Sequence, residues 1–330
     1  MLPDSNTRDV PTSADTRESV VVFSARESAD VLSRTVCSVL AYARPETRVE
    51  ILVNGNPPLS QAIALRLPDL LADAALANVR LWDIAMADKA NAWNQHIHHI
   101  WPDQGNAFYI DGYVRLLPDS LRLLRNRIAA SPEALGGTGT PSVARTAMRQ
   151  RELMLREGGL HGNFCVIKET ALRAMKTRGI RLPVGIYRTD STIGAYLSFG
   201  LDPGAYQWDP HKFIAIEPSA TWVTDKKHWW RVSDVKSTLN RKKRQAQGDF
   251  ENRSVRYHLS TLRMRPEHLP RTVGELVESW LAACAPEAQD AVRRSFFGKQ
   301  ALSILRSRRY SDLAGSEPRL VFDSRPLASF

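Results

Sequence analysis

Residues 19–56 decide the fold and read SVVVFSARESADVLSRTVCSVLAYARPETRVEILVNGN. The stretch begins with the β-branched run Ser19 to Phe23, which has the composition of a buried strand. A segment with apolar residues on one helical face follows, and then a second apolar run, Val49 to Val53, which ends at an Asn-Gly turn. Strand, helix, strand is the order that builds a parallel sheet through helical crossovers.

The same alternation continues to about residue 130. Further strands are predicted at Val79 to Trp82 and at Ala107 to Ile110, and a helix is predicted between them, from Lys89 to Ile100. We therefore predict an α/β fold with a doubly wound, mainly parallel sheet and helices on both faces. Ligands of such sheets bind outside the carboxyl ends of the strands, which places residues 24–27, 54–56 and 111–113 around one crevice.

The pattern changes after Gly136. We expect a Gly/Thr/Pro loop there, then an Arg-rich helix at Ala144 to Arg156 and a strand at Asn163 to Ile167. Helical patterns after Pro270 predict a C-terminal helical extension. The predicted organisation is a disordered lead-in over 1–18, a nucleotide-binding domain over 19–225 with halves 19–130 and 131–225, and a basic segment with the helical extension over 226–330.

Composition narrows the classes of function. A hydrophobic content of 43% in 330 residues is enough to bury a sizeable core, and the net charge of +10 suits phosphorylated substrates, anionic lipid surfaces or nucleic acid. Cys37, Cys165 and Cys284 lie far apart among apolar neighbours, which predicts buried thiols in a reducing compartment. No stretch approaches the roughly 20 apolar residues of a membrane span. We therefore expect a cytoplasmic protein, with any membrane contact peripheral and on the inner face.

Five short motifs follow one another through the predicted nucleotide-binding domain: Val20 to Glu27, Glu50 to Asn56, Lys89 to Asn94, Phe108 to Asp119 and Leu160 to Asp190. In this order they resemble the family 2 glycosyltransferases, which have a GT-A fold and transfer a sugar from a nucleoside diphosphate donor. The segment beginning at Lys89 is similar to the Lys-x-x-Ala-x-Asn signature of that family. Two positions depart from the family pattern, because Tyr113 replaces the second aspartate of its Asp-x-Asp metal motif and Thr189 replaces the glutamate of its Glu-Asp pair.

The resemblance makes residues 19–130 the donor half and residues 131–225 the acceptor half. It implies a nucleotide-sugar donor, with a UDP-sugar favoured, and a set of donor-binding residues. That set is Ser24, Arg26, Glu27, Asn54, Lys89, Asn94, Asp111, Arg241 and Arg244. Each position also has an ordinary structural interpretation: a surface pair at Arg26 and Glu27, a turn at Asn54, and a solvated charged face around Arg241.

A divalent cation, Mn2+ or Mg2+, is implied on Asp111, which directly follows an apolar strand. Because Tyr113 supplies no second carboxylate, the metal would rely on donor phosphates, water and a histidine such as His211 or His228. In the alternative, cationic side chains from residues 241–244 close over the diphosphate and partly replace the metal.

Asp190 is the predicted general base, which accepts the proton of the acceptor hydroxyl while the anomeric carbon is attacked with inversion. An aspartate after Thr189 is also a suitable first-turn acid for the following helix, and both roles are compatible.

The predicted function is therefore an inverting glycosyltransferase of surface polysaccharide, glycolipid or small-molecule glycoside synthesis. One alternative is a GT-A scaffold that has lost catalysis and binds only a nucleotide or glycan. A nucleic-acid footprint at Arg241 to Arg265 is the other alternative. Because few aromatic residues interrupt that basic segment, we expect no nucleic-acid partner and favour a lipid-linked, sugar or small-molecule acceptor.

Overall fold

The structure is a computed structural model that describes residues 18–72, 78–142, 145–224, 232–284, 286–294, 296–307 and 316–325. The side chains of residues 232–243 are not described. Three of the predicted contributors, His228 and the side chains of Arg241 and Lys242, therefore lie outside the described residues.

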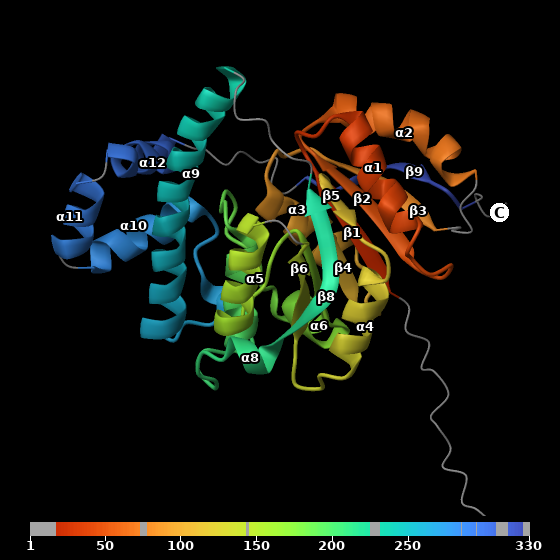
Figure 1. Ribbon diagram of the computed structural model, residues 1–330. Helices are drawn as coiled ribbons and strands as arrows, with labels where there is room; N and C mark the ends of the chain where they lie inside the picture. Colours follow the sequence, from red (N-terminus) through yellow and green to blue (C-terminus); the bar gives the residue numbers. More distant parts are fainter. Residues whose placement is uncertain are drawn as a thin grey trace, which may run out of the picture.

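The described residues form one mixed sheet with helices packed on both of its faces (Figure 1). Its strands are β1 (Ser19–Ser24), β2 (Arg48–Asn54), β3 (Val79–Ile84), β4 (Ala107–Asp111), β5 (Val114–Leu116), β6 (Gly136–Pro141), β7 (Phe164–Ile167), β8 (Ile214–Thr224) and β9 (Arg319–Asp323). The α-helices are α1 (Ala29–Leu40), α2 (Pro57–Leu71), α3 (Lys89–Gln95), α4 (Ser120–Ala129), α5 (Arg145–Glu157), α6 (Glu169–Arg178), α7 (Thr189–Ser198), α8 (Pro210–Phe213), α9 (Val232–Arg256), α10 (Val273–Ala283), α11 (Pro286–Arg294) and α12 (Phe296–Ser307). Shorter helical turns are η1 (His96–Ile100), η2 (Tyr257–Thr261) and η3 (Pro266–His268).

The strand order is β5-β8-β6-β7-β4-β1-β2-β3-β9. The four central strands β4, β1, β2 and β3 run parallel to one another, as the alternating strands and helices predicted. Antiparallel pairings join β4 to β7, β7 to β6, β8 to β5 and β3 to β9, while β6 and β8 pair in parallel. The predicted doubly wound α/β sheet is confirmed, with antiparallel strands added on both sides of its parallel centre.

Alternate residues of the central strands face two separate apolar layers. Val20 and Val22 of β1 are buried against α1, α2 and α4, whereas Val21 and Phe23 are buried against α3, α6 and α7. A strand that is covered on both faces needs apolar side chains on both faces, which explains the uninterrupted run at residues 20–23. The two layers hold β1 and β4 side by side, and the candidate site lies at the carboxyl ends of these strands.

The segment Gly136 to Pro141, predicted as a loop, is instead the buried strand β6. Its glycines allow very close strand packing. A Cβ atom added at Gly137 would lie 2.8 Å from the Ala215 carbonyl oxygen, and one at Gly139 would lie 2.2 Å from the Ala220 carbonyl oxygen. Glycine and threonine therefore provide a tight fit to β8 here, and their turn-like composition hides the strand from sequence analysis.

The C-terminal part is helical as predicted, with α9, α10 and α12 packed against one another and grouped at one side of the molecule (Figure 1). Its end differs from the prediction, because β9 returns to the sheet and pairs antiparallel with β3. The Arg80 guanidinium lies 3.0 Å from the Asp323 carboxylate and stabilises this pairing. Glu18, which the sequence placed in the lead-in, is buried and forms an ion pair with Arg125.

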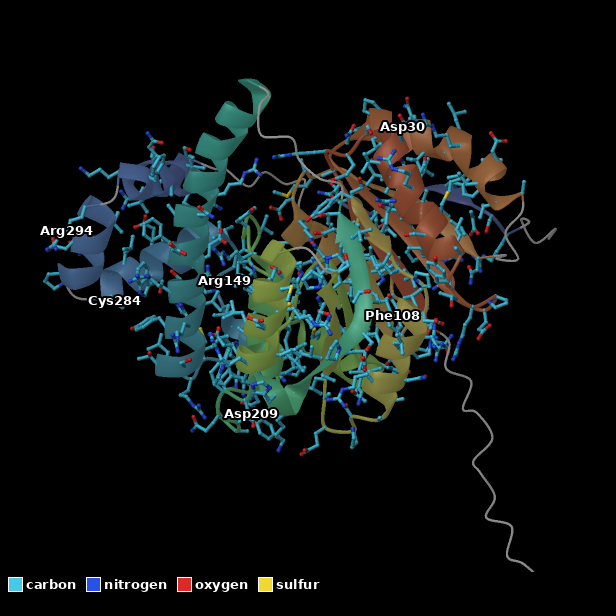
Figure 2. All side chains as sticks on the ribbon, in the orientation of Figure 1. Asp30, Phe108, Arg149, Asp209, Cys284 and Arg294 are labelled. Carbon is cyan, nitrogen blue, oxygen red and sulfur yellow. The ribbon has the colours of Figure 1, made fainter. Side chains whose placement is uncertain are left out.

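The three cysteines are free thiols, but they do not share one environment. Cys165 is buried, as predicted. Cys37 is exposed on α1 and Cys284 is half-buried at the end of α10, among the helices to the left in Figure 2. The prediction of buried thiols is therefore wrong for Cys37 and Cys284, because Cys37 lies on the outer side of its helix and Cys284 lies at the end of its helix.

None of the helices in the described ranges combines the length and the hydropathy of a membrane span.

Candidate active site

Charged and polar side chains from distant parts of the sequence meet where β1 and β4 end. We call this group the strand-end cluster and define it as Glu27, Lys89, Asp111, Tyr113, His161, Asn163 and Asp190. Hydrogen bonds or mutual electrostatic effects connect each member to another. The cluster lies at the carboxyl ends of the parallel strands, which is where ligands bind in open α/β sheets.

Asp111 is the last residue of β4, opposite Phe23 of β1. The next residue, Gly112, donates its backbone N–H to the Phe23 carbonyl at 2.7 Å. A Cβ atom at position 112 would lie 2.8 Å from that carbonyl oxygen, closer than real Cβ atoms approach. Glycine is therefore required for β4 to end directly against β1, and this close approach fixes the position of Asp111.

Two donors hold the Asp111 carboxylate. Lys89 Nζ forms a salt bridge with Oδ1, and the Tyr113 hydroxyl lies 3.0 Å from Oδ2. The Lys89 ammonium also lies 5.9 Å from the centroid of the Phe23 ring, at a cation–π distance. Burial alone would lower the pKa of Lys89, but the charge and hydrogen bond of Asp111 outweigh it and raise that pKa. Lys89 is therefore a firmly charged ammonium at neutral pH.

Access to the cluster from solvent runs past two of its members. The Lys89 side chain is 31% exposed and Tyr113 is 41% exposed, whereas the Asp111 side chain is only 12% exposed. The Tyr113 hydroxyl also lies 3.1 Å from Asn163 Oδ1, so its single proton has two competing acceptors. An incoming ligand therefore meets the ammonium and the phenol before it reaches the carboxylate.

The loop after β1 is closed by Glu27. Its carboxylate accepts hydrogen bonds from Ser24 Oγ at 2.7 Å and from the backbone N–H groups of Ala25 at 2.8 Å and Arg26 at 3.0 Å. Although burial works to raise the pKa of Glu27, these donors lower it, so the group is ionised at neutral pH. Arg26 is exposed, and Ser24 is buried. The structure therefore brings the predicted residues Ser24 and Glu27 to the strand ends and leaves Arg26 at the surface.

The loop after β2 lies beside the loop after β1. Asn54 is buried at the end of β2, and Asn56 donates its side-chain N–H to the Ala25 carbonyl at 2.8 Å. Gly55 has a φ angle of 65°, and a Cβ atom there would lie 2.3 Å from Ala87 Cβ. The close approach of Ala87 and the positive φ angle thus require glycine in this turn. Because β2 is the neighbour of β1 in the sheet, Asn54 at the end of β2 lies beside the strand-end cluster.

Asn94 does not join the cluster. Its side-chain amide donates to the Leu182 carbonyl at 2.9 Å and accepts the Leu182 N–H at 2.8 Å. Both atoms of this buried amide are therefore used to attach α3 to the segment before α7. The spacing of Asn94 to Lys89 reflects this structural attachment, which sequence analysis could not separate from donor binding.

Asp190 lies in the first turn of α7, and its Oδ2 accepts the backbone N–H of Gly162 at 3.1 Å. Because Gly162 lies between His161 and Asn163, this bond places Asp190 in the strand-end cluster, where its negative charge favours the charged forms of Lys89 and His161 and so acts to raise the pKa of each. Both sequence interpretations of Asp190 are compatible with this position, since the residue is a first-turn acid and also faces Lys89 electrostatically.

His161 and Asn163 are members of the cluster that the sequence did not select individually, although both belong to the glycine segment near residue 160. His161 Nδ1 accepts the Asn163 N–H at 3.2 Å, and its ring packs 5.1 Å from the Trp222 ring. Burial lowers the pKa of His161, against the opposing effect of Asp190 and Asp111, so the neutral imidazole is favoured. Their signal in the sequence is their place beside Gly162.

Helix α9 holds the segment that leads into α7. The buried carboxylate of Glu251 accepts the backbone N–H of Tyr187 at 2.9 Å and that of Arg188 at 3.1 Å. Burial raises the pKa of Glu251 to about 7, against these hydrogen bonds and one from Gln247. Arg244, one of the predicted donor-binding residues, is exposed on the same helix, with its guanidinium carbon 6.0 Å from the Tyr187 ring centroid.

The residues around Asp111 do not fit a divalent metal centre built by the protein. No three His, Cys, Asp or Glu side chains within the described ranges form a group that could hold a metal ion. Both carboxylate oxygens of Asp111 already face donors, and Tyr113 presents a hydroxyl in place of a carboxylate. His211, proposed from the sequence as a ligand, contacts the Arg156 carbonyl at 3.2 Å instead.

A separate hollow of about 790 Å3 lies between α10, α11 and α12. Apolar residues such as Leu281 and Leu302 line it together with Lys299 and Arg306. None of the predicted site residues lines this hollow, and its acidic lining residue, Glu278, forms an ion pair with Arg306. The strand-end cluster is therefore the candidate active site.

Comparisons with known proteins agree with the fold. No protein-family model matches the chain, and no curated protein matches it. Among solved structures, a mannosyltransferase, PcManGT from Pyrobaculum calidifontis in complex with GDP-Man and Mn2+, has a TM-score of 0.51 at 14% identity, over 88% of this chain and 84% of that one. Mouse xyloside xylosyltransferase 1, in its apo form, has a TM-score of 0.32 at 13% identity, over 48% of this chain and 69% of that one.

The likeness to PcManGT extends over most of both chains, so this chain has a GT-A-like fold with a C-terminal helical extension. The predicted fold class is confirmed. At 14% identity the likeness shows the fold alone, and membership of family 2 remains a prediction.

Proposed function

We propose that this chain is a glycosyltransferase that moves a sugar from a nucleoside diphosphate sugar to an acceptor hydroxyl, with inversion at the anomeric carbon. The observation that supports this most is that Lys89, Asp111 and Asp190, which lie far apart in sequence, form one electrostatic group at the strand ends of a GT-A-like fold. A cation for phosphate and a carboxylate for a hydroxyl proton are the two groups that this transfer requires.

Donor binding is assigned to the loops after β1 and β2 and to Lys89. We assign the base and ribose to the side of Asn54 and of the loop closed by Glu27, and the diphosphate to the charged Lys89. PcManGT has been solved with GDP-Man, while the sequence motifs favour a uridine nucleotide for this chain. The base of the donor is therefore the first quantity to measure.

In the proposed reaction, Asp190 accepts the proton of the acceptor hydroxyl. The acceptor oxygen attacks the anomeric carbon as the bond from that carbon to the diphosphate oxygen breaks. The bonding electrons leave with the nucleoside diphosphate, and the acceptor proton passes to the Asp190 carboxylate. Gly162 holds this carboxylate through its N–H, and Lys89 offsets the charge that develops on the leaving diphosphate.

The acceptor is assigned to the side of Tyr187 and Arg244, which are exposed beside the segment that leads to Asp190. An exposed cation there and the net charge of +10 suit an anionic or lipid-linked acceptor at the inner membrane face. A sugar or small-molecule acceptor is the alternative within the same proposal.

A catalytically inactive scaffold is the second candidate, favoured by the Tyr113 hydroxyl that faces Asp111 in place of a second carboxylate. Calorimetry with uridine and guanosine diphosphates tests the shared donor site, and release of nucleoside diphosphate from nucleotide sugars tests catalysis. The transferase proposal predicts both binding and release. Binding without any release, over a panel of donors and acceptors, would favour the scaffold. No binding of either nucleotide at millimolar concentration would overturn the donor site itself.

A further inference from the structure

The Asp111 carboxylate is already neutralised by a side chain of its own chain, because Lys89 forms a salt bridge with its Oδ1. We propose that Lys89 is the resident cation of the donor site and that a nucleoside diphosphate binds there without a divalent metal ion. This inference rests on the proposed function, since it concerns the diphosphate of the same donor. The family resemblance, in contrast, implies that Mn2+ or Mg2+ binds at Asp111.

Both oxygens of the Asp111 carboxylate already have a donor partner. One oxygen faces the Lys89 ammonium and the other lies 3.0 Å from the Tyr113 hydroxyl. A divalent cation at this carboxylate would have to displace an ammonium and a hydroxyl donor, and the positive charge of Lys89 would oppose it at short range. Asp111 is therefore better described as the anchor of Lys89 than as a metal ligand.

Within the described residues, Asp111 lacks the partner ligands that a divalent cation needs. Mg2+ and Mn2+ prefer several oxygen ligands, most often with carboxylates among them. Tyr113 stands where the second aspartate of the motif would be, and a phenol is a neutral donor at pH 7. Its hydroxyl is directed to Asp111 and Asn163, and the described residues offer no group of three suitable metal ligands.

Lys89 has N–H donors with which it can bind phosphate. An ammonium carries three N–H donors, and the Asp111 salt bridge uses one of them. The side chain is 31% exposed, so its remaining donors can reach a ligand from solvent. The Phe23 ring at 5.9 Å and the Asp111 carboxylate hold the ammonium in place before the ligand arrives. A fixed cation of this kind interacts with phosphate oxygens without the reorganisation that a mobile lysine requires.

The experiment measures binding of uridine and guanosine diphosphates by calorimetry, with the full chain in excess EDTA and again in excess Mn2+. We expect the same dissociation constant in both conditions for the nucleotide that binds. Lys89→Met should weaken binding about ten- to hundredfold in both, as expected for loss of one hydrogen-bonded charge. Lys212→Met removes an exposed lysine that pairs with Glu133, and it should leave binding unchanged.

Two further variants keep the test decisive. Lys89→Arg retains the cation and should restore most of the affinity, which separates loss of charge from loss of fold, while thermal melting reports on folding directly. Tyr113→Asp supplies the second carboxylate beside Asp111, and we expect this variant alone to bind the nucleotide more tightly with Mn2+ than with EDTA.

Each outcome has one meaning. Binding by the unmodified chain that requires Mn2+ would overturn the inference and leave the proposed function standing. Unchanged affinity of a folded Lys89→Met variant would also overturn it. Failure of both nucleotides to bind in either condition would instead contradict the proposed function.

Discussion

Gly162 donates its backbone N–H to Asp190 Oδ2 at 3.1 Å, and this bond joins the segment after α5 to the first turn of α7. The two residues are also in steric contact, because a Cβ atom at Gly162 would lie 3.0 Å from Asp190 Cβ. A carboxylate held by a backbone donor and packed against a glycine has few alternative rotamers. The position of the Asp190 carboxylate is thus set before any substrate binds.

Asp190→Asn should remove the base and preserve the fold. The asparagine side chain keeps an oxygen that can accept the Gly162 N–H. We expect turnover to fall about 100-fold to 10,000-fold, the usual contribution of general-base catalysis, with donor affinity nearly unchanged. Steady-state kinetics, calorimetry and melting temperature check this. A variant with near-normal turnover and a slightly lower melting temperature would make Asp190 a first-turn structural acid only, worth roughly 1 kcal/mol or less.

Gly112→Ala should destabilise the protein. The added methyl group would meet the Phe23 carbonyl oxygen at 2.8 Å and Ser24 Cβ at 2.9 Å, and both belong to the central strand β1. Because backbone cannot move aside easily, we expect a loss of about 1–3 kcal/mol in the free energy of unfolding, measured by denaturant titration. Gly204→Ala is the control, since the nearest atom there is a side-chain oxygen of Asp202 in an exposed turn. Equal stability of the two variants would contradict the close approach of β4 and β1.

The parallel centre of the fold could be predicted because its signal is local. Each of β1, β2, β3 and β4 is a short, mainly apolar run followed by a turn and a helix pattern, and the ends of parallel strands meet at one edge of the sheet. The meeting of Asp111 with the loop after β1 follows from that rule alone.

The remaining strands could not be predicted because their signals are not local. β6 has a turn-like composition, Gly136-Gly137-Thr138-Gly139-Thr140-Pro141, and becomes a strand only because β7 and β8 close around it. β9 is separated from its partner β3 by more than two hundred residues. The partner of Asn94 is also distant in sequence, so the sequence could name this residue but could not tell attachment to Leu182 from contact with a ligand.

Glu251 should make stability depend on pH. Burial raises its folded-state pKa from 4.5 to about 7, so folding favours the protonated carboxyl. This stabilisation is fully present below about pH 4.5 and is lost as the pH rises through about 7, a change of a few kcal/mol at about 1.4 kcal/mol per pKa unit. Glu251→Gln cannot ionise, and it should show a smaller fall in melting temperature between pH 5 and pH 8 than the unmodified chain.

The exposed Glu157 provides the control for Glu251. Its carboxylate lies 2.8 Å from Arg156 on the surface, so Glu157→Gln should leave the pH profile of the melting temperature unchanged. Parallel profiles for Glu251→Gln and the unmodified chain would show that the hydrogen bonds from Tyr187 and Arg188 keep Glu251 ionised in the folded state throughout this range.

Arg244 borders the proposed acceptor side and is also one of the donor-binding residues predicted from the sequence, so Arg244→Gln should weaken nucleoside diphosphate binding if its cation serves both. Arg244 is exposed to solvent, and its guanidinium lies 6.0 Å from the ring centroid of Tyr187. Tyr187 in turn precedes Asp190 by three residues. The loss of affinity from Arg244→Gln should therefore be smaller than that from Lys89→Met and should shrink as salt is added, because exposed charges are screened within about 10 Å at 0.1 M ionic strength.

Arg253→Gln is the matched control, since nine residues at 3.6 per turn place Arg253 on the opposite side of the helix from Arg244. Calorimetry at low and high salt should show a loss for Arg244→Gln that is greatest at low salt, and no loss for Arg253→Gln. Equal affinities of both variants at low salt would remove Arg244 from the donor site and leave it beside the acceptor.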